Sequence, residues 1–226
     1  MTEGAETSIS RRDKIIEALF TLLADQPIER IGLDDIARQG GISLADLRAE
    51  FSSVIAIVAA HMKKIDEQVL ATDMSDMHDE SVREKLFDVL MRRLEALAPH
   101  KEAIRSLMRS TWRDPPLALA LNTFTARSMS WMLTAAGIST AGPKGVLRAQ
   151  GTAFSYARVL STWIDDDDPG LARTMSALDR ELARGQQMSG LLDTLMAIPE
   201  RLQAGRWRAR RHRDTPGDDG HAVADH

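Results

Sequence analysis

Residues 33–58 carry the pattern that most constrains the fold, which is two short helices joined by a tight turn. Gly32 is placed to cap the first helix, whose apolar residues recur at helical spacing: Leu33, Ile36 and Ala37. Gly40 and Gly41 end that helix, because glycine reaches backbone angles that other residues avoid. Ser43 then begins the second helix. Helix, short glycine-containing turn and helix is an arrangement that reads DNA, although an ordinary helical hairpin has the same pattern.

The residues on either side of this pattern extend it. Residues 11–24 predict an amphipathic helix whose inner face is apolar: Ile15, Ile16, Leu19, Phe20 and Leu23. This helix, the helix pair ending in Phe51 and a long following helix resemble, in that order, the N-terminal domain of the TetR family of bacterial regulators. The resemblance covers about the first 60 residues and is carried by Leu33, Ile36 and Ala37, the turn at 40–43 and Phe51. It implies an all-α homodimer, with a three-helix helix-turn-helix head and a larger helical domain for ligand binding and dimerisation.

The resemblance also implies that the second helix of the pair enters the major groove of a double-stranded DNA operator. The residues expected to face the groove are Ala45, Asp46, Arg48 and Ala49. Backbone phosphates would be held by Arg11, Arg12, Lys14 and Arg38. The helix end at Ser43 would add its dipole. Members usually carry Tyr, His and Lys where this chain has Arg48, Ala49 and Val54, and residues 1–60 hold ten acids but six bases, so the basic surface rests on few residues.

The chain beyond the head is predicted to be helical almost throughout. Helical periodicity favours segments at 54–71, 82–98, 101–112, 117–136, 145–164 and 170–198. No strand alternation is present. We therefore expect three parts: a helix-turn-helix domain at 1–60, a helical ligand-binding and dimerisation domain at 61–213, and a disordered tail at 214–226.

Large apolar side chains gather in the second of these parts. They are Met108, Trp112, Phe124, Trp131, Phe154, Tyr156 and Trp163. Such residues either line a pocket between helices or form an ordinary core, and the sequence does not separate the two. The family resemblance implies a pocket for a small, mostly apolar ligand.

Several function classes are disfavoured by composition and motif. No cysteine, phosphate-binding glycine loop, HExxH pair or nucleophile elbow occurs, so we expect no enzyme, no catalytic residues, no metal site and no cofactor. His61 reads as a half-buried packing residue, and Asp165 to Asp168 as a turn that caps the next helix. No long apolar run and no signal peptide are recognised, which favours the cytoplasm.

The C-terminal part leaves one alternative open. Residues 160–185 are similar to part of the ubiquinone-biosynthesis lipid-binding proteins, which share the TetR-type fold without operator binding. That resemblance implies an isoprenoid or other lipid as partner. Residues 188–213 combine an apolar stripe with clustered arginines, which suits either a membrane-surface anchor or, as we favour, a helix packed on the domain with a solvated basic end. Segments 146–164 and 171–195 are expected to form the homodimer interface.

Overall fold

The computed structural model describes residues 10–72 and 79–187. All regular structure in these residues is helical, which confirms the all-α prediction. The described residues up to Gly185 form one compact unit. The predictions for residues 188–213 and for the tail 214–226 fall outside the described residues.

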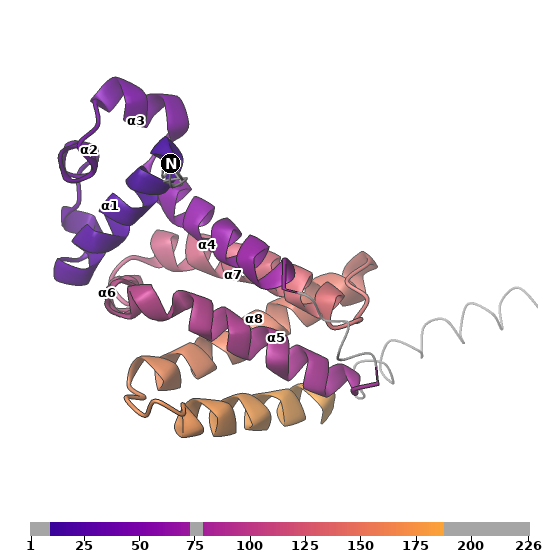
Figure 1. Ribbon diagram of the computed structural model, residues 1–226. Helices are drawn as coiled ribbons and strands as arrows, with labels where there is room; N and C mark the ends of the chain where they lie inside the picture. Colours follow the sequence, from indigo (N-terminus) through magenta and orange to yellow (C-terminus); the bar gives the residue numbers. More distant parts are fainter. Residues whose placement is uncertain (1–9, 73–78, 188–226) are drawn as a thin grey trace, which may run out of the picture. The chain divides into compact units, whose positions relative to one another are not determined.

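The N-terminal helices follow the predicted pattern closely. They are α1 (Arg11–Asp25), the 3-10 turn η1 (Ile28–Arg30), α2 (Leu33–Gly40) and α3 (Leu44–Glu50), drawn in indigo and purple in Figure 1. Gly32 begins α2, and its amide donates to the Asp35 carboxylate at 3.0 Å. Gly41 ends α2 at φ +61°, a left-handed conformation that glycine adopts at little cost.

These three helices share a core with the helices that follow them. Its fully buried side chains include Ile15, Leu19 and Leu23 from α1, Ile36 from α2, Leu47 from α3 and Ile57 from α4 (Val54–Leu70). Leu107 of α6 (Lys101–Thr111) and Leu117 of α7 (Pro115–Ala135) belong to the same cluster. Because α1 packs directly against α6, the head is tied to the rest of the chain by apolar burial as well as by α4.

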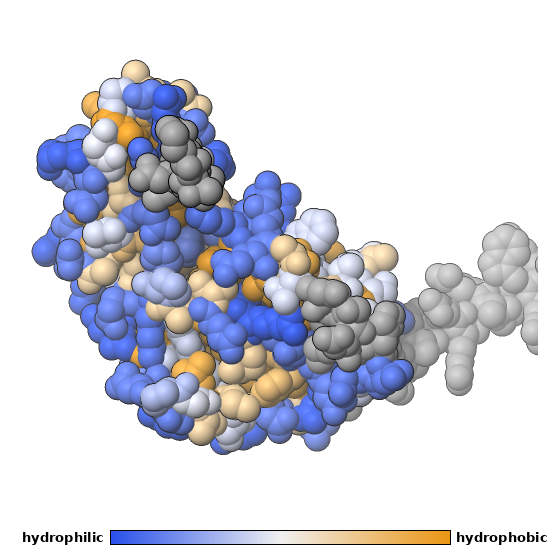
Figure 2. Space-filling view, viewed as in Figure 1, coloured by the Kyte–Doolittle hydropathy of each residue, from blue (hydrophilic) through white to orange (hydrophobic). Residues whose placement is uncertain are grey.

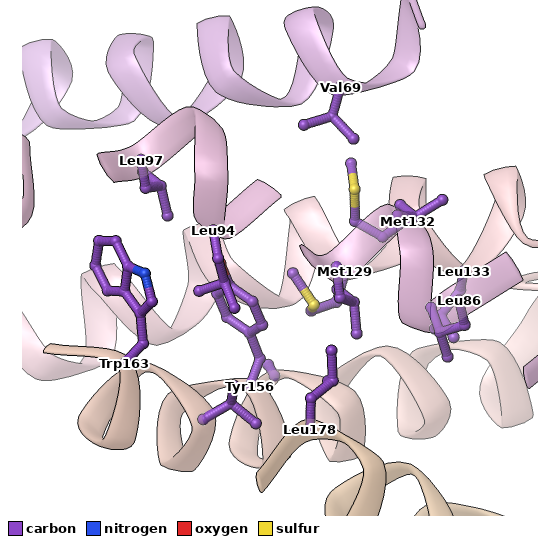
Figure 3. Close-up of a cluster of buried hydrophobic side chains, with 14 of the residues drawn as sticks. Val69, Leu86, Leu94, Leu97, Met129, Met132, Leu133, Tyr156, Trp163 and Leu178 are labelled. Atoms are coloured by element: carbon purple, nitrogen blue, oxygen red, sulfur yellow. The ribbon is translucent and has the colours of Figure 1, made fainter. Parts of the chain in front are cut away.

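The remaining helices build a second core. They are α5 (Val82–Leu97), α6, α7, α8 (Gly142–Ile164) and a helix over residues 172–187, with α4 running into this body from the head (Figure 1). Figure 3 shows Tyr156 and Trp163 of α8 among leucine and methionine side chains of this core. In the described residues, no helix is long and apolar enough to cross a membrane.

Two helices begin earlier than the sequence predicts. We expected starts at residues 117 and 145, but α7 begins at Pro115 and α8 at Gly142. In both cases proline lies in the first turn, where its missing N–H has no partner to lose. The glycine-rich loop expected at 137–145 is correspondingly shorter.

The acidic turn after α8 has the capping role predicted for it. The Asp166 carboxylate accepts hydrogen bonds from the backbone N–H and hydroxyl of Thr174 at 2.8 and 2.7 Å. The Asp168 carboxylate accepts from the N–H groups of Gly170 and Ala172. These bonds satisfy amides at the start of the helix over 172–187. In the described residues, no group of three or more His, Asp or Glu side chains is arranged to hold a metal ion.

Candidate nucleic-acid interface and internal cavity

Helix α3 presents one face to the exterior and one to the core of the head. Leu47 is buried, whereas Ala45, Arg48 and Ala49 are exposed. The Ser43 hydroxyl caps the helix by accepting from the Asp46 amide at 3.0 Å, and it donates to the Asp46 carboxylate at 2.7 Å. The structure thus places the predicted groove-facing residues on the outside of α3, except that Asp46 is half-buried at the helix start.

The pKa of Asp46 is lowered, first by the Ser43 hydroxyl and then by the nearby Arg11 guanidinium. Its carboxylate therefore stays ionised at neutral pH. A fixed negative charge at the start of α3 suits the positive end of the helix dipole. It also lies at the helix end whose dipole was expected to contribute to phosphate binding.

The basic residues of the head fall into two groups. Three arginines pair with carboxylates of the head: Arg11 with Asp46 at 3.2 Å, Arg12 with Glu50 at 3.8 Å, and Arg38 with Asp34 and Asp35 at 3.2 and 3.0 Å. Lys14, Arg30 and Arg48 are exposed and have no ion pair within the described part of the chain. Hydrophilic residues predominate on the face of the head seen in Figure 2. Because exposed ion pairs are worth only about 0–1 kcal/mol, these pairs hold the arginines only weakly.

A cavity of about 260 Å³ lies where helices of the head and body meet. Its wall is mostly apolar and comes from α1, α4, α5, α6, α7 and α8: Phe20, Val58, Met62, Leu97, Ile104, Leu107, Met108, Ala118, Leu121, Ala153, Phe154, Ala157 and Leu160. The polar lining residues are His61, Arg93, Thr111, Asn122, Thr125 and Tyr156. No aspartate or glutamate is among the lining residues.

Arg93 is held in a closed network at the wall of this cavity. Its Nε donates to Asp66 at 3.2 Å, and its two terminal nitrogens donate to the Tyr156 hydroxyl at 2.9 Å and to Ser128 at 3.3 Å. Ser128 donates in turn to the second Asp66 oxygen. Burial raises the pKa of Tyr156, so its hydroxyl keeps its proton. The charge of Arg93 is balanced by that of Asp66, and this pairing, with the hydrogen bonds to Tyr156 and Ser128, offsets the cost of burying the guanidinium.

His61 differs from Arg93 because neither of its ring nitrogens has a hydrogen-bond partner. The residue is only 3% exposed, so it is buried rather than half-buried as we expected. Its ring centroid lies 3.8 Å from that of Phe20 and 4.8 Å from that of His100. Burial, followed by the positive charges of His100, Lys64 and Arg93, lowers the pKa of His61 to about 3. The imidazole is therefore neutral at physiological pH.

The structure divides the seven predicted ligand-pocket residues. Met108, Phe154 and Tyr156 line the cavity. Trp163 lies in the core of the body, and Phe124 is half-buried outside the cavity wall. Two more lie on the surface, with Trp112 89% exposed and Trp131 56% exposed. Phe124, Trp131 and Trp163 lie on faces of α7 and α8 that do not line the cavity, and Trp112 lies just after the end of α6.

Sequence reasoning did not place His61 or Arg93 at a ligand site, although both line the cavity; His61 was predicted only as a packing residue. A signal for Arg93 was present, because it continues an apolar stripe four residues after Val89 and four before Leu97. A lone cation in an inward-facing position predicts a buried partner. Nothing in the sequence indicated that His61 would lack one.

Comparison with solved structures agrees with this geometry. No protein-family model and no curated protein sequence matches the chain. A TetR transcriptional regulator from Nitrosomonas europaea ATCC 19718 is similar in structure, with a TM-score of 0.61 and 20% identity over 79% of this chain and 99% of the regulator. A TetR regulator from Rhodococcus sp. RHA1 has a TM-score of 0.54 and 18% identity, covering 77% of this chain and 94% of its own. A TetR-family regulator from Streptomyces coelicolor has a TM-score of 0.53 and 15% identity, covering 89% and 90%. The resemblance predicted from the sequence is confirmed in the structure: the chain has the fold of the TetR-family transcriptional regulators.

Proposed function

We propose that this protein is a DNA-binding transcriptional regulator that acts as a homodimer and responds to a small, mostly apolar ligand. One observation carries the proposal. Phe20 of α1 lines the same cavity as residues of α4, α6, α7 and α8, while α1 also packs against α2 of the helix pair. A ligand in the cavity would therefore press on the helix that supports the DNA-reading pair.

The DNA contacts in this proposal follow from the exposed face of α3. Arg48 is the exposed cation of that helix and is placed to contact a guanine edge or a phosphate. Lys14 adds a second cation without an ion pair among the described residues, at the start of α1. Arg11, Arg12 and Arg38 would leave their carboxylates for phosphates as the DNA approaches.

Dimerisation is supported by apolar side chains left on the surface of the body. Val146, Leu147 and Phe154 of α8 are 70%, 45% and 56% exposed, and Met175 of the helix over 172–187 is 42% exposed. A symmetric contact through these two helices would cover the exposed side chains. It would also present two α3 helices to successive turns of the DNA major groove.

The test is the affinity of the purified protein for the DNA upstream of its own gene, measured by fluorescence anisotropy at physiological salt. We expect this duplex to bind at least a thousandfold more tightly than a shuffled one. Arg48→Ala should weaken specific binding about 5- to 150-fold, which corresponds to about 1–3 kcal/mol. Arg127→Ala, which removes an exposed arginine on α7, outside both α3 and the two proposed dimer helices, is the matched control and should change affinity little. Equal binding of both duplexes by the unaltered protein would contradict the proposal for this DNA.

The alternative function is a TetR-fold lipid-binding protein of the ubiquinone-biosynthesis type, without operator binding. The observation in its favour is that three arginines of the head are already paired with carboxylates. Against it, a cavity of about 260 Å³ is below the roughly 300–1,000 Å³ of typical small-molecule pockets and is small for a polyisoprenoid chain. Native mass spectrometry separates the two functions, since a lipid carrier purified from cells would retain a long-chain lipid.

A further inference from the structure

The polar side chains of the cavity wall are almost all satisfied by the protein itself. Thr111 donates to the Met108 carbonyl at 2.7 Å, and Thr125 donates to the Leu121 carbonyl at 2.8 Å. Asn122 accepts from Gln150 at 2.9 Å, and Arg93 and Tyr156 belong to the network with Asp66. Among the cavity-lining side chains, only His61 has buried polar atoms that find no hydrogen-bond partner within the described residues.

A neutral imidazole always offers one N–H donor and one bare nitrogen acceptor. Leaving both nitrogens unsatisfied in a buried site is costly. A ligand that makes one hydrogen bond to the ring would therefore bind more tightly than one that makes none. Both nitrogens are covered by protein atoms, so such a bond requires the ring to rotate about its Cβ–Cγ bond toward the cavity. That rotation would change the contact between the ring and Phe20 of α1, whose ring centroid lies 3.8 Å away.

The charges of the cavity wall exclude some classes of ligand. The lining includes the Arg93 guanidinium and no carboxylate, and the nearby Asp66 is already paired with Arg93. A cationic ligand would find no counter-ion in the wall, and an anionic ligand would find Arg93 already paired with Asp66. Either would lose its hydration, which is strongly unfavourable. The apolar majority of the wall favours a largely hydrocarbon body.

We propose that the cavity binds a small uncharged molecule with an apolar body and one hydroxyl group, and that His61 accepts a hydrogen bond from that hydroxyl. This assignment rests on the proposed ligand-responsive function and names the ligand class of the same cavity. It also assigns His61 as a specificity-determining residue. Ligand binding would change the contact of His61 with Phe20 of α1, the helix that joins the cavity to the head.

Three small probes of the same shape test this assignment: 4-butylphenol, butylbenzene and 4-butylbenzylammonium. Isothermal titration calorimetry gives the dissociation constant of each probe for the full chain, without DNA. We expect the phenol to bind most tightly and the ammonium probe to bind least. In His61→Leu, the preference for the phenol over butylbenzene should fall about tenfold or more, because the hydrogen bond is lost while the apolar contacts remain.

His100→Leu is the matched control, because His100 touches the His61 ring but is not among the lining residues. Its probe preference should equal that of the unaltered protein. A second measurement needs no variant: adding 4-butylphenol to the ¹⁵N-labelled protein should shift the His61 ring nitrogens, whereas butylbenzene should not.

Different results would overturn the assignment of His61 and the proposed regulator function. An unchanged preference in His61→Leu, or ammonium binding as tight as the phenol, overturns the inference and leaves the proposed regulator intact. Failure of all three probes to bind overturns both the inference and the ligand response. The DNA-binding proposal is decided separately by the anisotropy assay.

Discussion

The neutral state of buried His61 predicts a specific loss of stability in mild acid. The pKa of His61 is about 3 in the folded chain and 6.5 in the unfolded chain. Between these values the unfolded state binds more protons than the folded state, so the free energy of unfolding falls as the pH falls. The loss begins below about pH 6.5 and continues to about pH 3.

The size of this effect follows from the two pKa values. Unfolded His61 is about one-quarter protonated at pH 7 and almost fully protonated at pH 5, whereas folded His61 stays neutral at both. The linkage relation then gives a loss of about 2 kcal/mol between pH 7 and pH 5 from this one side chain. That is a sizeable part of the roughly 5–15 kcal/mol that keeps most domains folded.

Urea unfolding at pH 7 and pH 5, at fixed protein concentration, measures this loss for the unaltered protein and for His61→Leu. Leucine fills a similar volume but does not titrate, so the variant should lose about 2 kcal/mol less than the unaltered protein over this interval. The pKa of His100 is also lowered, first by burial, and its ring lies 4.8 Å from that of His61. The same comparison is therefore made in a His100→Leu background, where His100 cannot contribute to the difference. An equal loss in both proteins would refute the claim that His61 is buried and neutral.

Three further perturbations test separate parts of the structure. Arg93→Leu leaves the Asp66 carboxylate buried without its cation and should lower the free energy of unfolding by about 3–5 kcal/mol; adding Asp66→Leu to this variant should restore much of that loss. Thermal unfolding of the single and the double variant measures the difference, and equal stability of the two would contradict the pairing. Gly41→Ala should cost about 1 kcal/mol, because an added Cβ meets no atom within 4 Å and only the positive φ is unfavourable. If the chain forms the proposed dimer, Val146→Asp should convert it to monomers in sedimentation velocity. A dimer unaffected by this charge would place the interface elsewhere.

The head could be predicted in detail because its signals are local. Gly32 and Gly41 determine where α2 begins and ends, and Ser43 determines where α3 begins. They do so through backbone conformation and through capping bonds with neighbours in sequence. The inner face of α1 follows from helical spacing alone. Such features depend on a few adjacent residues, so they can be read from the sequence before any tertiary contact is known.

The cavity could be predicted only in part because its wall depends on how five or more helices meet. Helix α7 has apolar residues around much of its circumference, so spacing did not reveal that Trp131 faces outward while Met132 is buried. Trp112 ends up exposed because it lies at the loop between α6 and α7. The missing partners of His61 likewise arise from tertiary packing against Phe20, on a different helix.

Selection of binding sites from a random pool of duplex DNA tests the central claim most directly, because it assumes no operator. After several rounds of capture by the full chain at physiological salt, we expect an enriched inverted repeat whose half-sites are centred one or more helical turns apart, with one turn about 10–10.5 base pairs. Arg48→Ala should enrich a weaker or altered half-site, since Arg48 lies on the exposed face of α3. A pool that remains random, although the protein is folded and dimeric, would contradict the claim that this chain is a DNA-binding regulator.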